Sequence, residues 1–363
     1  MFSTCVEKDI IMKENEKSIK ESAKQALLSC LSEIPFIEAV DIQKGYRNET
    51  LQADISAEIR LPESGIQLVA EIKNTGQPRI ARDTVNQLLR YKDAFPDIYP
   101  VFIAPYISDK AAEICSSEGV GYLDLSGNCL LVFDKIFIRK EGRPNKFNEK
   151  RELKSLYSPK AERILRVLLC NPGKKWKTQE LADESRVSLG QVSNVKRLLY
   201  EREFISGERG GFKLEAPKTL LRQWSENYDY RKNVIREMYS LKSVSELEEA
   251  IALYCNRSKI PYAFTGFSGA ARIAPSVRYQ KAMIYAADLP ETILTAVSLK
   301  PVNSGGNLLL FAPYDNGVFY GSFKIDDIQI ASEVQIYLDL KGFRGRGEEA
   351  AEVVLERILD KSW

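Results

Sequence analysis

The sequence predicts a multidomain α/β protein, and three observations support this fold class. The chain has 363 residues, more than one typical domain contains. Its composition is 44% hydrophobic and 28% charged, so sizeable cores can be buried. Segments with the periodicities of helices and strands alternate along most of its length. We expect domains at residues 1–138, 158–215 and 216–363, with a basic linker at 139–157 after the first.

The first domain is expected to be an α/β sandwich. Residues 18–31 space their apolar side chains as a helix does, and Pro62–Gly65 is a turn by composition between two strands. A helix, a buried strand and another helix follow, and two strands around a Ser-Gly-Asn turn end the domain. The predicted order is αββαβαββ, with these later segments at residues 82–95, 99–106, 108–119 and 120–133.

The hairpin around Pro62–Gly65 carries the first candidate site. Antiparallel pairing about this turn places Asp54 opposite Lys73. Side chains alternate between faces, so Asp54, Glu71 and Lys73 gather at one end of one face. Asp54 and Glu71 offer the oxygen ligands that Mg²⁺ prefers, and Lys73 is placed to orient a water molecule and stabilise phosphate charge. The other interpretation is an ordinary solvated face with a cross-strand ion pair.

The helix after the hairpin places Gln87 and Tyr91 four residues apart, hence on one face. These residues and the order of helices and strands around them can be compared with those of a known family. Residues 15–135 resemble the PD-(D/E)xK nuclease superfamily, which has the restriction-endonuclease-like fold. The resemblance implies that Asp54 is the first acid, that Glu71-Ile72-Lys73 is the (D/E)xK motif, and that Gln87 and Tyr91 form the QxxxY extension. Ala53 stands where proline is often found, and activity stays an open question.

Two features of the composition narrow the chemistry. The chain contains no histidine, which excludes Ser-His-Asp and Cys-His catalysis and histidine-ligated zinc. Residues 139–177 carry thirteen Lys and Arg against four Glu. Such a segment is typical either of a solvated linker or of contact with an anionic partner, among which nucleic acid comes first.

The second expected domain is a compact helical unit. Ser158 begins a helix, Thr178 is expected to cap a second, and Ser188 is expected to cap a third. A hairpin with a glycine-rich turn at residues 207–211 follows. Three helices and such a hairpin resemble a winged helix-turn-helix that binds double-stranded DNA. The expected DNA contacts are Ser188, Gln191, Asn194, Lys196 and Arg197 on the third helix and Arg209 and Lys213 in the wing. The alternative is a unit used only for protein contacts.

The last third combines two distinctive segments. Gly266-Phe267-Ser268 forms a turn like that of nucleotidyltransferases, but the next strand, residues 282–287, lacks their metal-binding acids. We therefore expect an α/β domain that resembles a degenerate nucleotidyltransferase. "TGFSGAARIAP" together with "VQIYLDL" and "RGEEAAE" resembles the AbiEi family of type IV toxin–antitoxin systems over residues 158–363. The resemblance implies operator binding, autoregulation and a cognate toxin of the nucleotidyltransferase kind.

Three functions follow as hypotheses. The leading one is a DNA-binding regulator of AbiEi type with a nuclease-like N-terminal domain. The alternative is a Mg²⁺-dependent DNA endonuclease targeted by the winged helix, and the third is a scaffold in which neither site works. Six scattered cysteines, a charged N-terminus and the absence of a long apolar stretch favour a cytoplasmic protein without a membrane segment.

Overall fold

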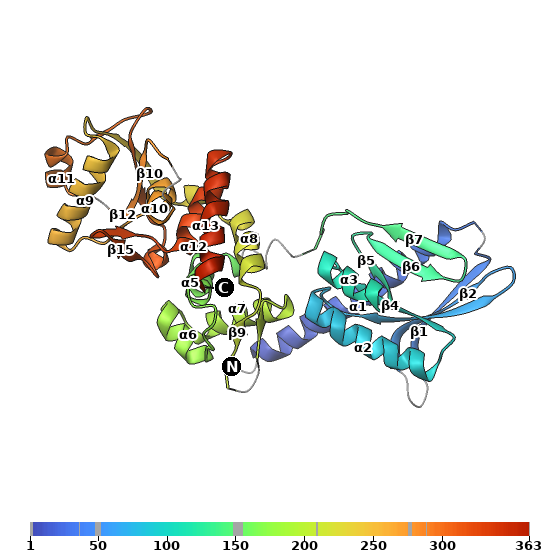
Figure 1. Cartoon of the computed structure of the whole chain (residues 1–363). Coiled ribbons are helices and arrows are strands. Elements are labelled where there is room, and N and C mark those ends of the chain that lie inside the picture. Colours follow the sequence, from blue (N-terminus) through green and yellow to red (C-terminus); the bar gives the residue numbers. More distant parts are fainter. Residues whose placement is uncertain are drawn as a thin grey trace. The chain divides into compact units, whose positions relative to one another are not determined.

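We analysed a computed structural model of the chain (Figure 1). The structure describes residues 3–35, 37–47, 52–147, 155–207, 210–274, 278–287 and 289–362. It divides into two compact units, Met1–Arg151 and Glu152–Trp363. Within the described residues, no helix combines the length and apolar character needed to cross a membrane.

The first unit is built on one seven-stranded sheet whose strands lie in sequence order. The outer pairs are antiparallel, whereas β3, β4 and β5 run parallel to one another. The carboxyl ends of these three strands therefore meet at one edge, and β7, antiparallel to β6, ends there too. The strands are β1 (Ala39–Arg47), β2 (Gln52–Arg60), β3 (Gly65–Ile72), β4 (Ile98–Ala104), β5 (Gly121–Asp124), β6 (Cys129–Phe133) and β7 (Ile136–Lys140).

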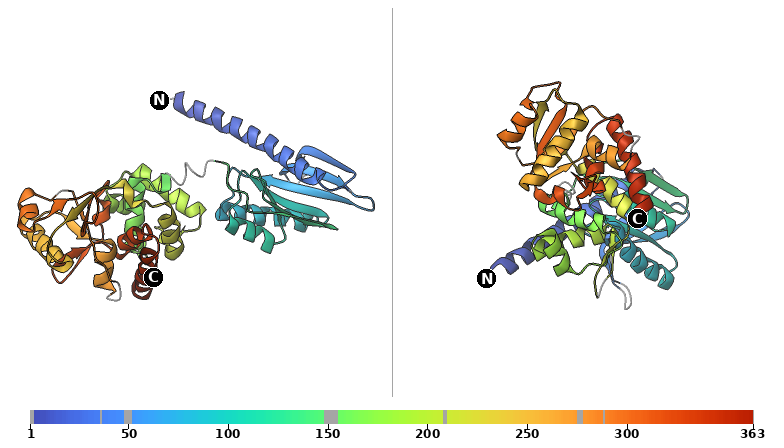
Figure 2. Two further views of the ribbon diagram at one scale, coloured as in Figure 1. Left: turned by 90° about the horizontal axis from the view of Figure 1, so that it is seen from above. Right: turned by 60° about the vertical axis from the view of Figure 1, so that its left-hand side comes forward.

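Three helices cover both faces of this sheet. Helix α1 (Ser3–Ser32) packs Leu27 and Leu31 against one face, while α2 (Pro78–Ala94) and α3 (Asp109–Ser117) pack against the other. Figure 2 shows this arrangement in its left view, with the blue helix α1 on one side of the sheet and the teal helices on the other. The sheet is thus buried on both sides, as an α/β sandwich requires.

Two strands, β1 and β7, are absent from the predicted order αββαβαββ. Both are outermost strands, which pair on one side only. Such strands have few buried positions, so their hydrophobic alternation is weak. In β7, Ile136 is buried whereas Phe137 is 67% exposed.

The register of the β2–β3 hairpin differs from the prediction by two residues. Arg60 lies opposite Gly65, and Leu61 N–H donates to the Ser64 carbonyl oxygen at 2.8 Å, so the turn occupies residues 61–64. The predicted pairing of Asp54 with Lys73 is therefore wrong. Because side chains alternate with a period of two, a shift of two residues leaves the side chains of the paired residues, Ile55–Arg60 and Gly65–Ala70, on their predicted faces.

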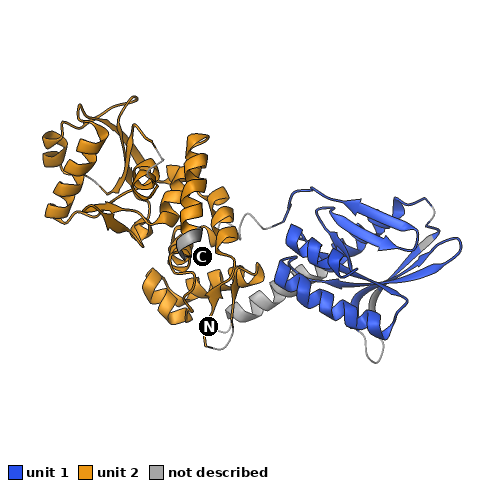
Figure 3. Cartoon of the chain, viewed as in Figure 1, with its two compact units in different colours: residues 1–151 blue, residues 152–363 orange. Residues whose placement is uncertain are grey.

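Figure 3 shows the second unit in orange. From residue 159 on, it contains three helices followed by a short hairpin. The third helix buries an apolar stripe made of Val192, Val195, Leu198 and Leu199. Ser188 is its N-cap and accepts the Gln191 N–H at 3.3 Å. Thr178 is not a cap: α6 begins at this residue, and Lys177 precedes it as N-cap, because Trp176 is already held by backbone bonds to Phe212. The elements are α5 (Pro159–Cys170), α6 (Thr178–Ser185), α7 (Leu189–Glu201), β8 (Ile205–Ser206) and β9 (Lys213–Leu214).

The rest of this unit surrounds a second seven-stranded sheet, in the order β13-β10-β14-β12-β11-β16-β15. Its strands are β10 (Val234–Tyr239), β11 (Tyr262–Phe264), β12 (Ala282–Ala286), β13 (Lys300–Pro301), β14 (Leu308–Ala312), β15 (Phe323–Ile325) and β16 (Ile328–Ile330). Its helices are α8 (Pro217–Asn227), α9 (Val244–Ser258), α10 (Gly266–Ile273), α11 (Glu291–Ala296), α12 (Glu333–Lys341) and α13 (Arg346–Ser362), with short 3-10 turns at Tyr230–Lys232 and Asn316–Phe319.

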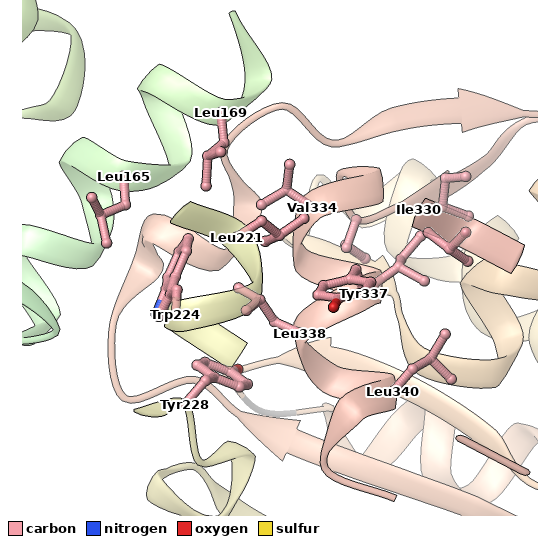
Figure 4. Packing of buried hydrophobic residues seen from close by; sticks show 14 of the residues in the cluster. Leu165, Leu169, Leu221, Trp224, Tyr228, Ile330, Val334, Tyr337, Leu338 and Leu340 are labelled. Carbon is pink, nitrogen blue, oxygen red and sulfur yellow. The ribbon is translucent and has the colours of Figure 1, made fainter. Parts of the chain in front are cut away.

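One large hydrophobic core extends through most elements of the second unit, beside a smaller cluster around Met283 and Phe311. Figure 4 shows Leu165 and Leu169 of α5 together with Trp224 of α8 and Val334 and Leu338 of α12. The expected boundary between residues 215 and 216 lies inside this unit. The three-helix segment is therefore packed against the C-terminal elements over a continuous apolar core.

A buried carboxylate, Asp339, organises polar groups inside this core. Its Oδ1 accepts hydrogen bonds from the Tyr228 hydroxyl at 2.8 Å, the Tyr285 hydroxyl at 2.9 Å and the Gln335 amide at 2.9 Å. Its Oδ2 accepts the Thr265 hydroxyl at 2.5 Å. Burial raises the pKa of Asp339 to about 6, although these four hydrogen bonds favour the ionised form.

This raised pKa predicts a pH dependence of stability. Because the folded state holds the proton more tightly than the unfolded state, Asp339 contributes stability below pH 4 that is lost as pH rises through 6. The unfolding free energy of wild type minus that of Asp339→Asn is therefore expected to decrease by roughly 3 kcal/mol from pH 4 to pH 7. Wild type loses this stability because it must ionise a buried carboxyl, whereas the asparagine does not titrate. Denaturant titrations at several pH values measure it, and a difference that does not change with pH would contradict the raised pKa.

Candidate functional site

The predicted acids and lysine lie together where β2 and β3 run side by side. Asp54 Oδ2 accepts the backbone N–H of Ile72 at 2.9 Å, which fixes the aspartate beside the end of β3. Lys73 Nζ lies 3.0 Å from Glu71 Oε2. Glu71 is only 4% exposed. Asp54, Glu71 and Lys73 therefore form one cluster, as the shared face of the hairpin predicts.

Helix α2 adds the two residues expected from it. Gln87 Nε2 donates to the Tyr91 hydroxyl at 2.6 Å. That hydroxyl lies 3.4 Å from Glu71 Oε1 and 3.0 Å from the Gln52 carbonyl oxygen, so it donates to one of them at a time. Gln87 and Tyr91 thus lie on the side of the helix that faces the cluster. Tyr91 lies at Glu71 Oε1, whereas Lys73 binds Oε2, and Gln87 donates to the Tyr91 hydroxyl.

Helix α1 supplies a residue that the sequence did not indicate. Lys20 Nζ lies 2.7 Å from Asp54 Oδ1, so Asp54 is paired with a lysine from a distant helix rather than across the hairpin. The neighbouring residues Ile19 and Ala23 belong to the apolar stripe of α1, which sets the helix on the sheet. Only this packing places Lys20 within reach of Asp54, and no local pattern marks it.

Burial dominates the electrostatics of the cluster. It raises the pKa of the Glu71 carboxyl, while the Lys73 ammonium and the Tyr91 hydroxyl oppose the shift and the Asp54 charge adds to it. The solvated-face interpretation is wrong for this end of the hairpin, because Glu71 and Ser56 are both buried. Two carboxylates are thus held near each other, with two lysines balancing their charge.

The donor set can be compared with the needs of a metal ion. Mg²⁺ typically takes one or two carboxylates and completes its shell with water and substrate phosphate. Asp54 and Glu71 fit this requirement, provided that Lys20 releases Asp54 Oδ1. Three or more metal-binding side chains do not come together anywhere in the described ranges, so a cage made wholly of protein ligands is not formed there.

The predicted DNA contacts on α7 have different surroundings. Ser188 is exposed but uses its hydroxyl as the helix cap, and Gln191 is half-buried. Asn194 is also half-buried and donates to the Ser155 hydroxyl at 2.9 Å. The exposed face of the helix instead includes Leu189, Gly190, Ser193 and Arg197, of which only Arg197 was selected from the sequence.

The cationic candidates mostly have partners inside the unit. Arg197 pairs with Glu201 at 2.8 Å, while the Lys196 ammonium lies 4.8 Å from the centre of the Phe212 ring. Lys213 Nζ is 3.2 Å from Glu215. Arg209 lies outside the described residues.

The turn that resembles a nucleotidyltransferase motif packs inside the second unit. Gly266 has a φ of 51°, and a Cβ atom there would come within 2.5 Å of the Met283 sulfur. The buried Ser268 hydroxyl accepts the Met283 N–H at 2.9 Å. This turn therefore connects β11 to α10 and packs against Met283 of β12, where only a residue without a side chain fits.

These features define a two-unit α/β protein with a carboxylate–lysine cluster in its first unit. Comparison with known proteins adds a family for part of the second. Residues 213–360 match the family model described as a transcriptional regulator, the AbiEi antitoxin of a type IV toxin–antitoxin system. The match begins in β9 and extends into α13, so this part of the chain is similar to AbiEi antitoxins.

Comparisons with solved structures and with curated proteins identify no family for the chain. A solved structure titled "Structure of EndoMS in apo form" aligns at 16% identity with a TM-score of 0.21. The alignment covers 28% of this chain and 45% of that one, so this chain spans under half the length of that relative. No curated protein matches the chain.

Proposed function

We propose that the protein is a DNA-binding transcriptional regulator of AbiEi type that acts as the antitoxin of a type IV toxin–antitoxin system. The observation that carries this proposal is the family match at residues 213–360. The partner expected from it is a cognate toxin of the nucleotidyltransferase kind. Co-purification with such a protein, encoded next to this chain, tests the partnership, and failure to associate would reject it.

In this proposal, the three helices and hairpin of residues 158–215 are a winged helix-turn-helix. Two small residues, Gly190 and Ser193, lie on the exposed face of α7, which lets the helix backbone approach a major groove closely. Lys174, Lys175 and Lys177 are exposed just before α6. Lysines at such a position suit phosphate contacts, whose contribution weakens as salt rises.

A carboxylate placed on this face of α7 is expected to repel DNA. We predict that Ser193→Glu weakens affinity for duplex DNA at least about tenfold, because the new charge faces phosphates. The helix itself should tolerate the change, since a glutamate four residues before Arg197 favours an ion pair. Fluorescence anisotropy with a labelled duplex measures the affinity.

The matched control is Thr219→Glu, which adds the same charge at an exposed position of α8. We expect this variant to keep wild-type affinity within about twofold, because surface charges away from a contact are largely screened. Equal weakening by both variants would show a non-specific charge effect and would remove α7 from the DNA interface.

We propose a second function for the first unit, Mg²⁺-dependent endonuclease activity on DNA. The observation that favours it is the convergence of Tyr91 and Lys73 on the buried Glu71 beside Asp54, with Gln87 bound to the Tyr91 hydroxyl. Asp54 and Glu71 would hold Mg²⁺, which when bound neutralises phosphate charge and lowers the pKa of water. Lys73 would orient the attacking water and stabilise the charge that develops on the phosphate, while Tyr91 keeps the Glu71 carboxylate in position.

Conversion of supercoiled plasmid to nicked or linear DNA tests this second function. We expect product with Mg²⁺ and none when EDTA replaces it. If supercoiled, linear and single-stranded DNA all stay intact in the presence of Mg²⁺, the endonuclease proposal fails.

A further inference from the structure

The segment that follows β7 is held in place by the Ser-Gly-Asn turn between β5 and β6. Asn128 Oδ1 accepts the backbone N–H of Arg143 at 2.8 Å, and its amide Nδ2 donates to the Arg143 carbonyl oxygen at 3.0 Å. The Ser126 hydroxyl accepts the Lys146 N–H at 3.3 Å. These bonds hold residues 143–146, at the start of the basic segment 139–157, through their backbone. The side chains of Arg143 and Lys146 are not used in them and can bind a ligand.

A buried carboxylate anchors this turn. Asp124 is fully buried and accepts the backbone N–H groups of Ile107, Gly127 and Asn128, together with the Asn128 amide. Gly127 has a φ of 102°, and a Cβ atom there would come within 2.9 Å of the Arg143 side chain. The turn is thus shaped both to bind Asp124 and to let Arg143 cross directly over it.

This docking site lies at the same edge of the sheet as the carboxylate–lysine cluster. The edge is formed by the carboxyl ends of the parallel strands β3, β4 and β5. Neighbouring strands are about 4.8 Å apart, so the ends of β3 and β5 are separated by about 10 Å. That distance equals about three base steps of one DNA strand at 3.4 Å each. One bound duplex can therefore contact both places.

The charges at this segment favour an anion. Arg143 and Lys146 are exposed, and neither forms an ion pair with any described residue. Arg139, by contrast, is paired with Glu141 at 2.7 Å. The groove of about 610 Å³ beneath the segment also receives Asp109 and Glu113 from α3, so its lining is mixed in charge. Arg143 lines this groove and Lys146 does not, so the anion contacts are assigned to these two unpaired side chains and not to the other residues of the groove.

We propose that Arg143 and Lys146 bind two phosphates of duplex DNA and thereby position the strand at Asp54, Glu71 and Lys73. This role rests on the proposed endonuclease function: Arg143 and Lys146 would position its substrate, which is duplex DNA. Asn128 acts through Arg143, since its side-chain amide sets the path of the backbone that carries the guanidinium.

The test compares two double variants of the full chain that remove the same charge. Arg143→Gln/Lys146→Gln changes the proposed contacts. Arg60→Gln/Lys135→Gln is the control, because both residues are exposed and lie at the opposite edge, where the 61–64 turn meets the β6–β7 turn. Binding of a fluorescein-labelled 30-base-pair duplex of mixed sequence is measured in EDTA over a range of salt concentrations.

We expect the slope of log affinity against log salt to fall by about 2 in magnitude in Arg143→Gln/Lys146→Gln, because each lost phosphate contact lowers it by about 1. The control should keep the wild-type slope. In plasmid cleavage with Mg²⁺, the first variant should raise KM about tenfold while kcat stays within about threefold, since positioning groups act through binding.

The outcomes separate the inference from the function on which it rests. A reduced slope without cleavage by wild type supports the phosphate contacts and rejects the endonuclease. Cleavage by wild type with an unchanged slope in Arg143→Gln/Lys146→Gln overturns the inference and keeps the endonuclease. Equal slopes in the two double variants, or no binding of duplex DNA by wild type, also overturn it.

Discussion

Replacement of Lys73 by alanine is expected to lower Mg²⁺-dependent DNA cleavage by about a thousandfold. In the proposed mechanism the ammonium stabilises charge that develops on the phosphate, and loss of one such group typically costs two to three orders of magnitude in rate. Asp54→Ala should have at least as large an effect, because it removes one of two carboxylates available to the metal. Rates of plasmid nicking under single-turnover conditions measure both losses.

The control for this experiment is Lys92→Ala. Lys92 is a half-buried lysine of α2 that forms no ion pair with a described residue, so its loss should leave cleavage within about twofold of wild type. Duplex affinity in EDTA should survive in all three variants, which separates lost chemistry from lost binding. Cleavage that persists in both Asp54→Ala and Lys73→Ala would show that the activity comes from elsewhere.

Loss of the buried Arg166 should strongly destabilise the second unit. Arg166 and Glu162 of α5 are both fully buried, with Nη1 3.6 Å from the Glu162 carboxylate. Arg166 Nε also donates to Gln335 of α12 at 2.9 Å. In Arg166→Met, the Glu162 carboxylate keeps the Tyr314 hydroxyl and the partly exposed Lys232, whose Nζ lies 3.5 Å away, but loses its fully buried cation. Breaking a buried pair from one side typically costs about 3–5 kcal/mol.

The chain itself provides a selective probe for this loss. Its three tryptophans, Trp176, Trp224 and Trp363, all lie in the second unit, so tryptophan fluorescence reports the unfolding of that unit alone. Guanidinium titration gives the unfolding free energy. Arg222→Met, which removes an exposed partner of Glu352, should cost less than about 1 kcal/mol.

A companion variant separates charge from packing. Glu162→Gln/Arg166→Met removes both buried charges, so it should recover part of the stability that Arg166→Met loses. If Arg166→Met is no more destabilising than Arg222→Met, the buried pair does not hold α5 against the C-terminal elements.

Local sequence patterns were sufficient for part of the candidate site. The positions of Asp54, Glu71 and Lys73 along β2 and β3 predict that they gather at one end of the hairpin, and this held although the register was wrong by two residues. The spacing of Gln87 and Tyr91 brings both side chains to one face of α2 by the same kind of local geometry. Such periodicities depend only on the backbone of a single element or hairpin.

Other parts of the site were decided by contacts between residues far apart in the chain. Lys20 reaches Asp54 across 34 residues, and Asn194 turns to Ser155 rather than to solvent. The docking of Arg143 on Asn128 joins the segment after β7 to the β5–β6 turn through side-chain and backbone groups that carry no periodic signal. Each of these pairs depends on how whole helices and strands pack against one another. The periodicity of residues within one element carries no information about that packing.

The sequence by itself therefore determined the inner strands of the first sheet, its helices, and the end of the hairpin at which the polar side chains gather. The tertiary structure decided how deeply Glu71 is buried, which lysine pairs with Asp54, and where the basic segment leaves the sheet. The physical reason is that periodicity reports a local backbone geometry, whereas burial and ion pairing depend on the helices that cover each face.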